Sequence, residues 1–433
     1  MNNIILENCL IAKLRPRARN PRTHSKKQIR QIADSIKEFG FLNPVLVDKD
    51  YGIIAGHGRV EGAKLLGMTG VPTVRVDHLT ETQIRGYVIG DNKIALNAGW
   101  NVELLKLELK ELSENLGFDV TLTGFETAEI DQLIIGEEAD PDDTVPAVDT
   151  TRRAVSRPGD LWRVGRHFVL CGDATKAESY RELLQGEEAQ MVFTDPPYNV
   201  RIQGHVSGLG KAKHEEFAMA SGEMCASEFT RFLSDVFLNL ANYSADASIH
   251  YICMDWRHMG EVLEAAKDRY TELKNLCVWA KTNGGMGSFY RSQHELVFVY
   301  QAGAGSHINN VELGKHGNYR TNVWSYAGMN SFGANRDAEL ALHPTVKPVA
   351  LVADAIKDAS KRNGIILDAF GGSGTTLLAA HRTGRRGYAL EISPQYVDTI
   401  VKRMEDATAE KAVLHKTGES FSAVRAWRES GLE

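Results

Sequence analysis

Two short motifs in this sequence carry residue types that could do chemistry. The first, Asp195-Pro196-Pro197-Tyr198, directly follows the apolar run at 191–193. A carboxylate and a carbonyl fixed by prolines could accept both N–H groups of an amine on a planar ring, which would localise the nitrogen lone pair. Tyr198 offers a face on which the ring could stack. We therefore predict four catalytic residues: Asp195, Pro196, Pro197 and Tyr198. For the motif alone, a proline-rich turn capped by an aspartate is the alternative.

The second motif is a glycine-rich turn that follows the apolar run 365–367 and precedes a helix predicted over 375–381. Its glycines permit close approach to the backbone, and a helix N-terminus favours an anion such as the carboxylate of S-adenosylmethionine. Such turns also serve nicotinamide and flavin cofactors. Glu391 ends the next predicted strand, where an acid suits a ribose diol. We predict these cofactor-binding residues: Asp368, Phe370, Gly371, Gly372, Ser373, Gly374, Thr375 and Glu391.

Two further residues are candidates for cofactor contacts. Lys347 lies in a His-Pro-Thr-Val-Lys-Pro segment at 343–348, before an amphipathic stretch, and could approach the cofactor's carboxylate. The alternative is an ordinary proline-delimited helix start. Asp173 precedes the catalytic strand and could contact the cofactor's adenine or cap a helix. Together the motifs indicate methyl transfer from S-adenosylmethionine to the amino group of a nucleic-acid base.

The elements around both motifs predict an α/β fold. From Gly159 to about Gly418 strands alternate with helices, which is typical of a mostly parallel sheet. We expect strands at 191–193, 247–254, 277–280, 295–299, 364–370 and 386–392. Ligands bind beyond the carboxyl ends of such strands, where both motifs lie. The little-patterned stretches 200–221 and 303–336 are predicted to be long functional loops.

A smaller α+β unit is predicted before this sheet. A helix should begin near Ser25 and end at Gly40, with short strands at 45–47, 52–55 and 71–76. Further helices are expected at 59–66, 81–89 and 102–116. The acidic, polar stretch 137–158 has the composition of a linker. The predicted domains are therefore 1–136, a linker over 137–158, and 159–433.

Composition sets broad limits on the class of protein. The 433 residues carry a net charge of −6, and 43% of them are hydrophobic, as in ordinary globular proteins. We expect no membrane segment, no signal peptide and a cytoplasmic location. The five cysteines are scattered, which argues against a zinc site or disulfides, and no metal is predicted. The stretch 13–30 has eight basic residues and no acid, and could contact phosphates or simply be solvated.

Residues 159–405 resemble the β-class, permuted amino DNA methyltransferases. The motifs that carry the resemblance are D-P-P-Y, H-P-T-V-K-P, D-x-F-x-G-S-G-T-T and a following Glu, in that order. The resemblance implies a Rossmann-like sheet, S-adenosylmethionine as donor, double-stranded DNA as substrate and a target-recognition segment at about 200–340. It also implies adenine N6 more than cytosine N4, because Asp195 heads the first motif.

Residues 4–120 resemble the ParB-like domain, which shares its outline with sulfiredoxin. The matching segments are I-x-x-F-G-x-x-x-P-V at 36–45, I-A-G-H-G-R at 54–59 and V-P at 71–72. The resemblance implies a nucleotide site at the Gly56–Arg59 turn. His57 stands where sulfiredoxins carry a reactive Cys, which argues against reductase activity. Val60 and Glu61 replace a second arginine, which argues against nucleotide hydrolysis.

The sequence therefore predicts a DNA methyltransferase specific for adenine N6, acting without a covalent enzyme intermediate. Cytosine N4 methylation and methylation of RNA stay open. So does a ParB-like DNA-binding module with a degenerate methyltransferase domain. A nicotinamide oxidoreductase is disfavoured because it would leave the D-P-P-Y motif without a purpose. A homodimer is one possible assembly.

Overall fold

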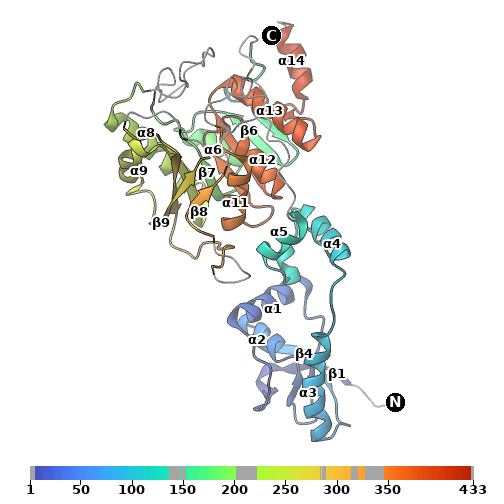
Figure 1. The fold of residues 1–433 in the computed structure, drawn as a ribbon. Helices are drawn as coiled ribbons and strands as arrows, with labels where there is room; N and C mark the ends of the chain where they lie inside the picture. The colour runs from blue at the N-terminus through green and yellow to red at the C-terminus, as the bar shows by residue number, and fades with distance from the viewer. Residues whose placement is uncertain are drawn as a thin grey trace. The chain divides into compact units, whose positions relative to one another are not determined.

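The computed structural model describes residues 5–135, 148, 153–200, 222–282, 284, 289–313, 320–326 and 346–430. The chain divides into two compact units, Met1–Ile134 and Ile135–Glu433, whose elements are labelled in Figure 1. Most of the predicted linker lies outside the described residues, and so do 201–221 and 327–340 of the expected target-recognition segment. Within the described residues, no helix is both long and apolar enough to cross a membrane.

The first unit contains a four-stranded sheet of order β1-β4-β2-β3. Its strands are β1 (Ile5–Leu10), β2 (Val45–Val47), β3 (Ile53–Ala55) and β4 (Gly70–Arg75). Its helices are η1 (Ile11–Lys13), α1 (Lys26–Phe39), α2 (His57–Leu65), α3 (Glu81–Ala95), α4 (Val102–Glu114), η2 (Val120–Thr123) and α5 (Thr127–Ile135). Only β4 and β2 pair in parallel, and the expected α+β class is confirmed.

Local signals set the bounds of α1 as predicted. The Ser25 hydroxyl accepts a hydrogen bond from the backbone N–H of Gln28, and Gly40 ends the helix at a φ of 81°. Strand β1 was not predicted, because its register is fixed by pairing with the distant β4. Such long-range pairing leaves little local pattern.

The second unit contains a ten-stranded sheet of order β11-β9-β10-β8-β7-β12-β13-β6-β5-β14. Its strands are β5 (Leu161–Val164), β6 (His167–Cys171), β7 (Ala189–Thr194), β8 (Ser244–Met254), β9 (Glu272–Ala280), β10 (His294–Gln301), β11 (Val323–Ser325), β12 (Ile365–Asp368), β13 (Arg386–Glu391) and β14 (Val413–Leu414). Its helices are α6 (Ala177–Leu184), α8 (Ala226–Asn242), η3 (Trp256–His258), α9 (Met259–Ala266), α11 (Val349–Ala359), α12 (Thr375–Arg382), α13 (Pro394–Thr408) and α14 (Phe421–Glu429).

The centre of this sheet is parallel, as the sequence predicts. Strands β8, β7, β12, β13 and β6 run in the same direction, so their carboxyl ends form one edge. Strand β10 runs antiparallel to β8 and β9. The amino end of β10 therefore lies at the edge that holds the carboxyl ends of the parallel strands.

Helices cover both faces of the sheet, which gives the unit two apolar layers. Residues of α11, α12 and α13, orange to red in Figure 1, pack in one layer with Met191 and Phe193 of β7. Residues of α6, α8 and α9 pack in the other layer with Val192. Alternate residues of β7 thus face opposite layers, and the strand end is held from both sides.

Candidate active site at the carboxyl edge of the sheet

The two sequence motifs meet at neighbouring strand ends. Strands β7 and β12 pair in parallel, with Val192 opposite Leu367. The Thr194 hydroxyl donates to Oδ1 of Asp368 at 2.9 Å and accepts from the backbone N–H of Ala369 at 3.2 Å. The residue before the Asp195–Tyr198 turn, called the catalytic turn after its predicted role, is therefore bonded directly to the start of the glycine-rich turn at 368–375, called the glycine turn. This contact spans 174 residues of sequence.

The catalytic turn begins where β7 ends. Its two polar side chains, Asp195 and Tyr198, contact each other. The Tyr198 hydroxyl lies 2.7 Å from Oδ1 of Asp195, to which it can donate. Pro196 is buried and Pro197 is partly buried, so the turn packs against the end of the sheet. Asn199 closes the turn in the left-handed region, at a φ of 52°. Its side-chain oxygen accepts from the backbone N–H of Gly222 at 3.0 Å.

Glu295 joins this turn from a distant strand. It is the second residue of β10, and it is buried at the edge where the parallel strands end. Its Oε2 lies 3.1 Å from the Tyr198 hydroxyl, and its Oε1 accepts from Nζ of Lys281. Glu295 was not among the residues predicted from the sequence. The only local sign is a charged residue at the start of an apolar strand.

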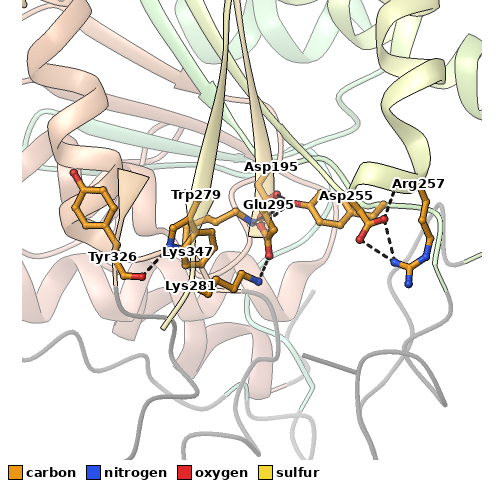
Figure 2. A network of polar contacts seen from close by, with 9 residues as sticks. Asp195, Asp255, Arg257, Trp279, Lys281, Glu295, Tyr326 and Lys347 are labelled. Atoms are coloured by element: carbon orange, nitrogen blue, oxygen red, sulfur yellow. Dashed lines mark hydrogen bonds and ion pairs between the residues drawn. The ribbon is translucent and has the colours of Figure 1, made fainter. Parts of the chain in front are cut away.

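Lys347 lies at the centre of the network in Figure 2. Its buried ammonium lies 2.5 Å from Oδ2 of Asp195, 2.9 Å from Oε2 of Glu295 and 3.1 Å from the Tyr198 hydroxyl. An ammonium has three N–H donors, so these acceptors match its full capacity. We expected Lys347 near the carboxylate of the cofactor. The structure directs it at the catalytic turn, and its role toward the cofactor stays a prediction.

An aromatic ring lines the same network. Nζ of Lys281 lies 4.7 Å from the centre of the Trp279 ring, and Nζ of Lys347 lies 5.9 Å from it. Both distances permit a cation–π contact. The indole N–H of Trp279 donates to the Tyr326 carbonyl at 3.0 Å, which fixes the ring (Figure 2).

Burial and charge act in opposite directions on the two acids of this network. Burial raises the pKa of Asp195, and the neighbouring Glu295 raises it further, against the lowering effect of Lys347. Burial would also raise the pKa of Glu295, but Lys347 and Lys281 outweigh it and lower the pKa to about 2. Lys347 itself has a raised pKa, because its two acid partners outweigh its desolvation. Glu295 and Lys347 are thus both charged at neutral pH.

The glycine turn leads from β12 into α12 and turns tightly against α13. Gly372 and Gly374 have φ values of 50° and 84°, in the left-handed region that favours glycine. A Cβ on Gly371 would lie 3.0 Å from Cδ1 of Ile400. At Gly372 it would meet only the Phe370 carbonyl, at 3.9 Å. The turn is therefore packed on one side and open at Gly372.

Among the described residues, the two acids that flank the glycine turn accept hydrogen bonds from uncharged donors only. Oδ2 of Asp368 accepts from the Thr376 hydroxyl at 2.6 Å, and its Oδ1 accepts from the Phe370 N–H at 3.0 Å. Glu391 accepts from the backbone N–H groups of Gly372 and Ser393, both at 2.8 Å. Burial raises the pKa of Asp368 and of Glu391 to about 7 in each case.

A buried arginine supports the glycine turn from behind. Nη1 of Arg403, on α13, donates to the Ser373 carbonyl at 2.9 Å and lies 3.3 Å from the Thr375 hydroxyl. Ser373 and Thr375 thus hold the turn in place through Arg403. Arg403 was not predicted from the sequence, because α13 follows the motif and shows no motif of its own.

Asp173 lies at the same edge, beside the end of β13. The backbone N–H of the preceding Gly172 donates to the Glu391 carbonyl at 3.0 Å. Oδ1 of Asp173 accepts from both the N–H and the hydroxyl of Thr175, at 2.8 Å each. Helix α6 has Lys176 as its N-cap. The helix-capping alternative for Asp173 is therefore wrong, and its contact with the cofactor's adenine stays a prediction.

In the first unit, the Gly56–Arg59 turn opens α2. Gly56 has a φ of 107°, and Nη2 of Arg59 donates to the Pro44 carbonyl at 3.2 Å. Nε2 of His57 accepts from the backbone N–H of Arg17 at 3.4 Å, and burial lowers the pKa of this histidine. His57 therefore acts as a neutral structural residue of the turn.

The basic stretch 13–30 is partly neutralised within the first unit. Arg17 forms two hydrogen bonds with Glu81, the shorter at 2.7 Å, and Lys27 lies 2.9 Å from Glu126. These two cations therefore pair with acids of their own unit.

Three family models match successive parts of the chain. The model described as "ParB N-terminal domain" matches residues 2–92, and "ParB-methyltransferase HTH domain" matches 103–158. The model described as "DNA methylase" matches residues 189–402. The helix-turn-helix match covers α4, α5 and the stretch that we interpreted as a linker.

Individual proteins resemble separate parts of the chain. The ParB-like nuclease domain-containing protein YnaK of Escherichia coli (strain K12) is 49% identical over 73 residues, which are 17% of this chain and 84% of YnaK. The type II methyltransferase M.HpaI of Haemophilus parainfluenzae is 22% identical over 253 residues, which are 55% of this chain and 74% of M.HpaI. The structure of an M1.HpyAVI–SAM complex has 20% identity and a TM-score of 0.41, covering 55% of this chain and 98% of its own.

Proposed function

This chain belongs to the N6/N4 amino DNA methyltransferases and carries ParB-type domains ahead of its methyltransferase domain, and from that premise we propose that it methylates adenine N6 in double-stranded DNA, with S-adenosylmethionine as the donor. The observation that carries the proposal is the bond between Thr194 and Asp368. It joins a turn suited to an exocyclic amine to a turn suited to the donor, at adjacent strand ends.

At the catalytic turn, the target base leaves the duplex and its amine faces Asp195. Each carboxylate oxygen has two lone pairs, and the contacts with Lys347 and Tyr198 occupy one on each oxygen. A lone pair remains to accept one N–H of the amine, and the Pro196 carbonyl accepts the other. The nitrogen lone pair, drawn out of the ring, would then be directed at the methyl group, whose bond to the sulfonium sulfur would break to leave a thioether as the N–C bond forms, and the amine proton would leave to water.

The residues of the glycine turn fit S-adenosylmethionine. The open side of Gly372 leaves room for close approach to the backbone, and Glu391 offers a carboxylate to the ribose hydroxyls. Asp173, one strand further along, faces the adenine. When bound, the cofactor supplies an activated methyl group on sulfur. The protein contributes position and electrostatic complementarity rather than a covalent intermediate.

Adenine is proposed over cytosine because an aspartate heads the catalytic motif. Digestion of the methylated DNA to nucleosides, followed by mass spectrometry, separates N6-methyladenine from N4-methylcytosine. We expect N6-methyladenine alone, and N4-methylcytosine as the product would overturn the choice of base.

The reaction itself is tested with Asp195→Ala. Purified protein is incubated with double-stranded DNA and methyl-labelled S-adenosylmethionine, and the label in DNA is counted. We expect label with the natural protein and none above background with the variant. Undiminished labelling by Asp195→Ala would contradict the assignment. An RNA duplex of the same sequence, which should stay unlabelled, separates DNA from RNA as substrate.

The first unit is proposed to bind DNA through its helix-turn-helix segment and a nucleotide at the Gly56–Arg59 turn. The left-handed Gly56 precedes α2, and the first N–H groups of a helix have no partner within the helix and suit a phosphate. Equilibrium dialysis with labelled nucleoside triphosphates tests this site. We expect Arg59→Ala to abolish binding there without loss of S-adenosylmethionine binding.

A further inference from the structure

Glu295 has no part in the activity as derived so far, yet it is the most heavily bonded acid at the catalytic turn. Its two oxygens contact three side chains: Lys281, Lys347 and Tyr198. It is buried on β10, a strand that runs opposite to the strand bearing the motif. Burying a second carboxylate next to Asp195 costs free energy unless a counter-charge offsets it. A buried pair of acids of this kind therefore indicates a functional role.

The counter-charge is complete within the network. Two acids, Asp195 and Glu295, are matched by two lysines, Lys281 and Lys347. Lys347 contacts both acids, whereas Lys281 contacts only Glu295 of the two. The side chain of Lys281 is 29% exposed, against 4% for that of Lys347. Asp195 is thus paired directly with Lys347, which it shares with Glu295, and Glu295 has a second cation in Lys281.

The geometry decides between two roles for Glu295. As a direct acceptor for the amine it would compete poorly with Asp195, because three of its four lone pairs already face donors of the protein, against two of four on Asp195. As a proton relay through Tyr198 it would need to hold a proton. The two lysines keep it ionised. What remains is an indirect role through Lys347 and Tyr198.

We propose that Glu295 is a positioning residue for methyl transfer, which draws Lys347 and the Tyr198 hydroxyl partly away from Asp195 and so keeps Asp195 a strong acceptor for the target amine. Without Glu295, Lys347 would pair with Asp195 alone and compete with the amine for its lone pairs. The inference rests on the proposed function, because it assigns Asp195 to that amine.

A change in the charge of Glu295 must then reach Asp195. The groups that face Asp195 come from every neighbouring element: Tyr198 of its own turn, Lys347 before α11, Glu295 of β10, Cys253 of β8 and Asp368 of β12. Glu295→Gln keeps the shape and removes one negative charge. The pKa of Asp195 should fall, because Glu295 raises it in the natural protein. A weaker base is also a weaker hydrogen-bond acceptor.

The test is the pH dependence of methylation by Glu295→Gln, measured between pH 4.5 and 8. We expect kcat to fall about 10- to 100-fold, the range seen when a residue that orients a metal ligand is removed. KM for DNA should stay close to the natural value. The acidic limb of the kcat profile, where Asp195 takes up a proton, should move to lower pH. A purely structural role would reduce the amount of active protein and leave the limb in place.

Lys281→Gln gives a second test with the opposite sign. It removes a positive charge from the far side of Glu295, so the acidic limb should move to higher pH, by less than in Glu295→Gln. Glu187→Gln is the matched control. Glu187 also binds a cation and a tyrosine, Arg386 and Tyr388, but it precedes β7 at the other end of the strand. The acidic limb of the kcat profile should not move in Glu187→Gln.

The outcomes separate this inference from the proposed function. Shifts of opposite sign in the two variants support the role of Glu295. If the natural protein methylates DNA and the acidic limbs of both variants coincide with its own, the role of Glu295 is overturned and the proposed function stands. Lack of methylation by the natural protein, or full methylation by Asp195→Ala, overturns the proposed function. If Glu295→Gln does not fold, the shift in Lys281→Gln still decides.

Discussion

Asp195 follows β7 and Asp368 ends β12, two neighbouring parallel strands, but different kinds of group contact the two carboxyls. Asp195 contacts an ammonium and belongs to a network of two acids and two lysines. Asp368 contacts two hydroxyls and a backbone N–H. Both lie at the same sheet edge, but the Asp195 side chain is 26% exposed and Asp368 is 4% exposed. The two acids therefore differ in their partners as well as in their depth.

The charge of Asp195 thus takes part in the proposed reaction, whereas Asp368 holds the glycine turn in place. Burial and Glu295 raise the pKa of Asp195, and the ion pair with Lys347 opposes them by favouring the ionised form, which is the stronger acceptor. Burial, without a contacting cation among the described residues, raises the pKa of Asp368 to about 7 even though the hydroxyls of Thr376 and Thr194 lower it. Changes at the first acid should therefore alter the rate. Changes at the second should alter stability and cofactor binding.

The largest expected effect comes from Asp195→Asn, which keeps the shape and removes the charge. We expect kcat to fall about 100- to 1000-fold, as when one preorganised polar group is lost from an active site. S-adenosylmethionine binding, followed by titration calorimetry, should stay close to that of the natural protein. Asp354→Asn is the control, because Asp354 also binds a tyrosine and a lysine but lies on α11 outside both motifs. If both variants kept full activity, the charge of Asp195 would have no catalytic role.

A smaller effect is expected from Gly374→Ala on the cofactor side. The added Cβ would lie 3.2 Å from Cγ2 of Ile400, and a left-handed alanine costs about 1–2 kcal/mol. If the turn shifts to relieve this strain, S-adenosylmethionine binding should weaken about 5- to 30-fold. Gly86→Ala, in α3, meets no atom within 4 Å and should leave calorimetric affinity unchanged. Natural affinity in Gly374→Ala would mean that the turn is not where the cofactor binds.

The same contrast explains what could be predicted from the sequence. The glycine turn was predicted with its helix and strand, because its residues are contiguous and their conformations are local. The four residues of the catalytic turn were likewise predicted to follow a buried strand. Glu295 was missed because an antiparallel strand places it there, and strand order is not written in a local pattern. Arg403 was missed for the same reason.

Asp368→Asn should change the pH dependence of stability. In the natural protein the folded pKa of about 7 exceeds the usual value near 4, so the folded state holds a proton that the unfolded state releases. Stability should therefore fall as pH rises from about 4 to 7, by roughly 1 kcal/mol between pH 6 and 7. Urea unfolding at both pH values should show a smaller difference in the variant. An equal difference in both proteins would assign the pH dependence elsewhere.

Glu391 extends the comparison, because it shares the high pKa of Asp368 but is proposed to meet the ribose. Hydroxyl donors favour the ionised form of a carboxylate, so binding of S-adenosylmethionine should lower the pKa of Glu391 from about 7 and release part of a proton. Affinity should then rise with pH through 7 and level off above it. Calorimetry at pH 7 in two buffers of different ionisation enthalpy measures the release directly. Glu391→Gln should abolish it, whereas Asp368→Asn should retain it. Release that persists in Glu391→Gln and disappears in Asp368→Asn would exchange the roles of these two acids, and the ribose would then lie at the end of β12 rather than of β13.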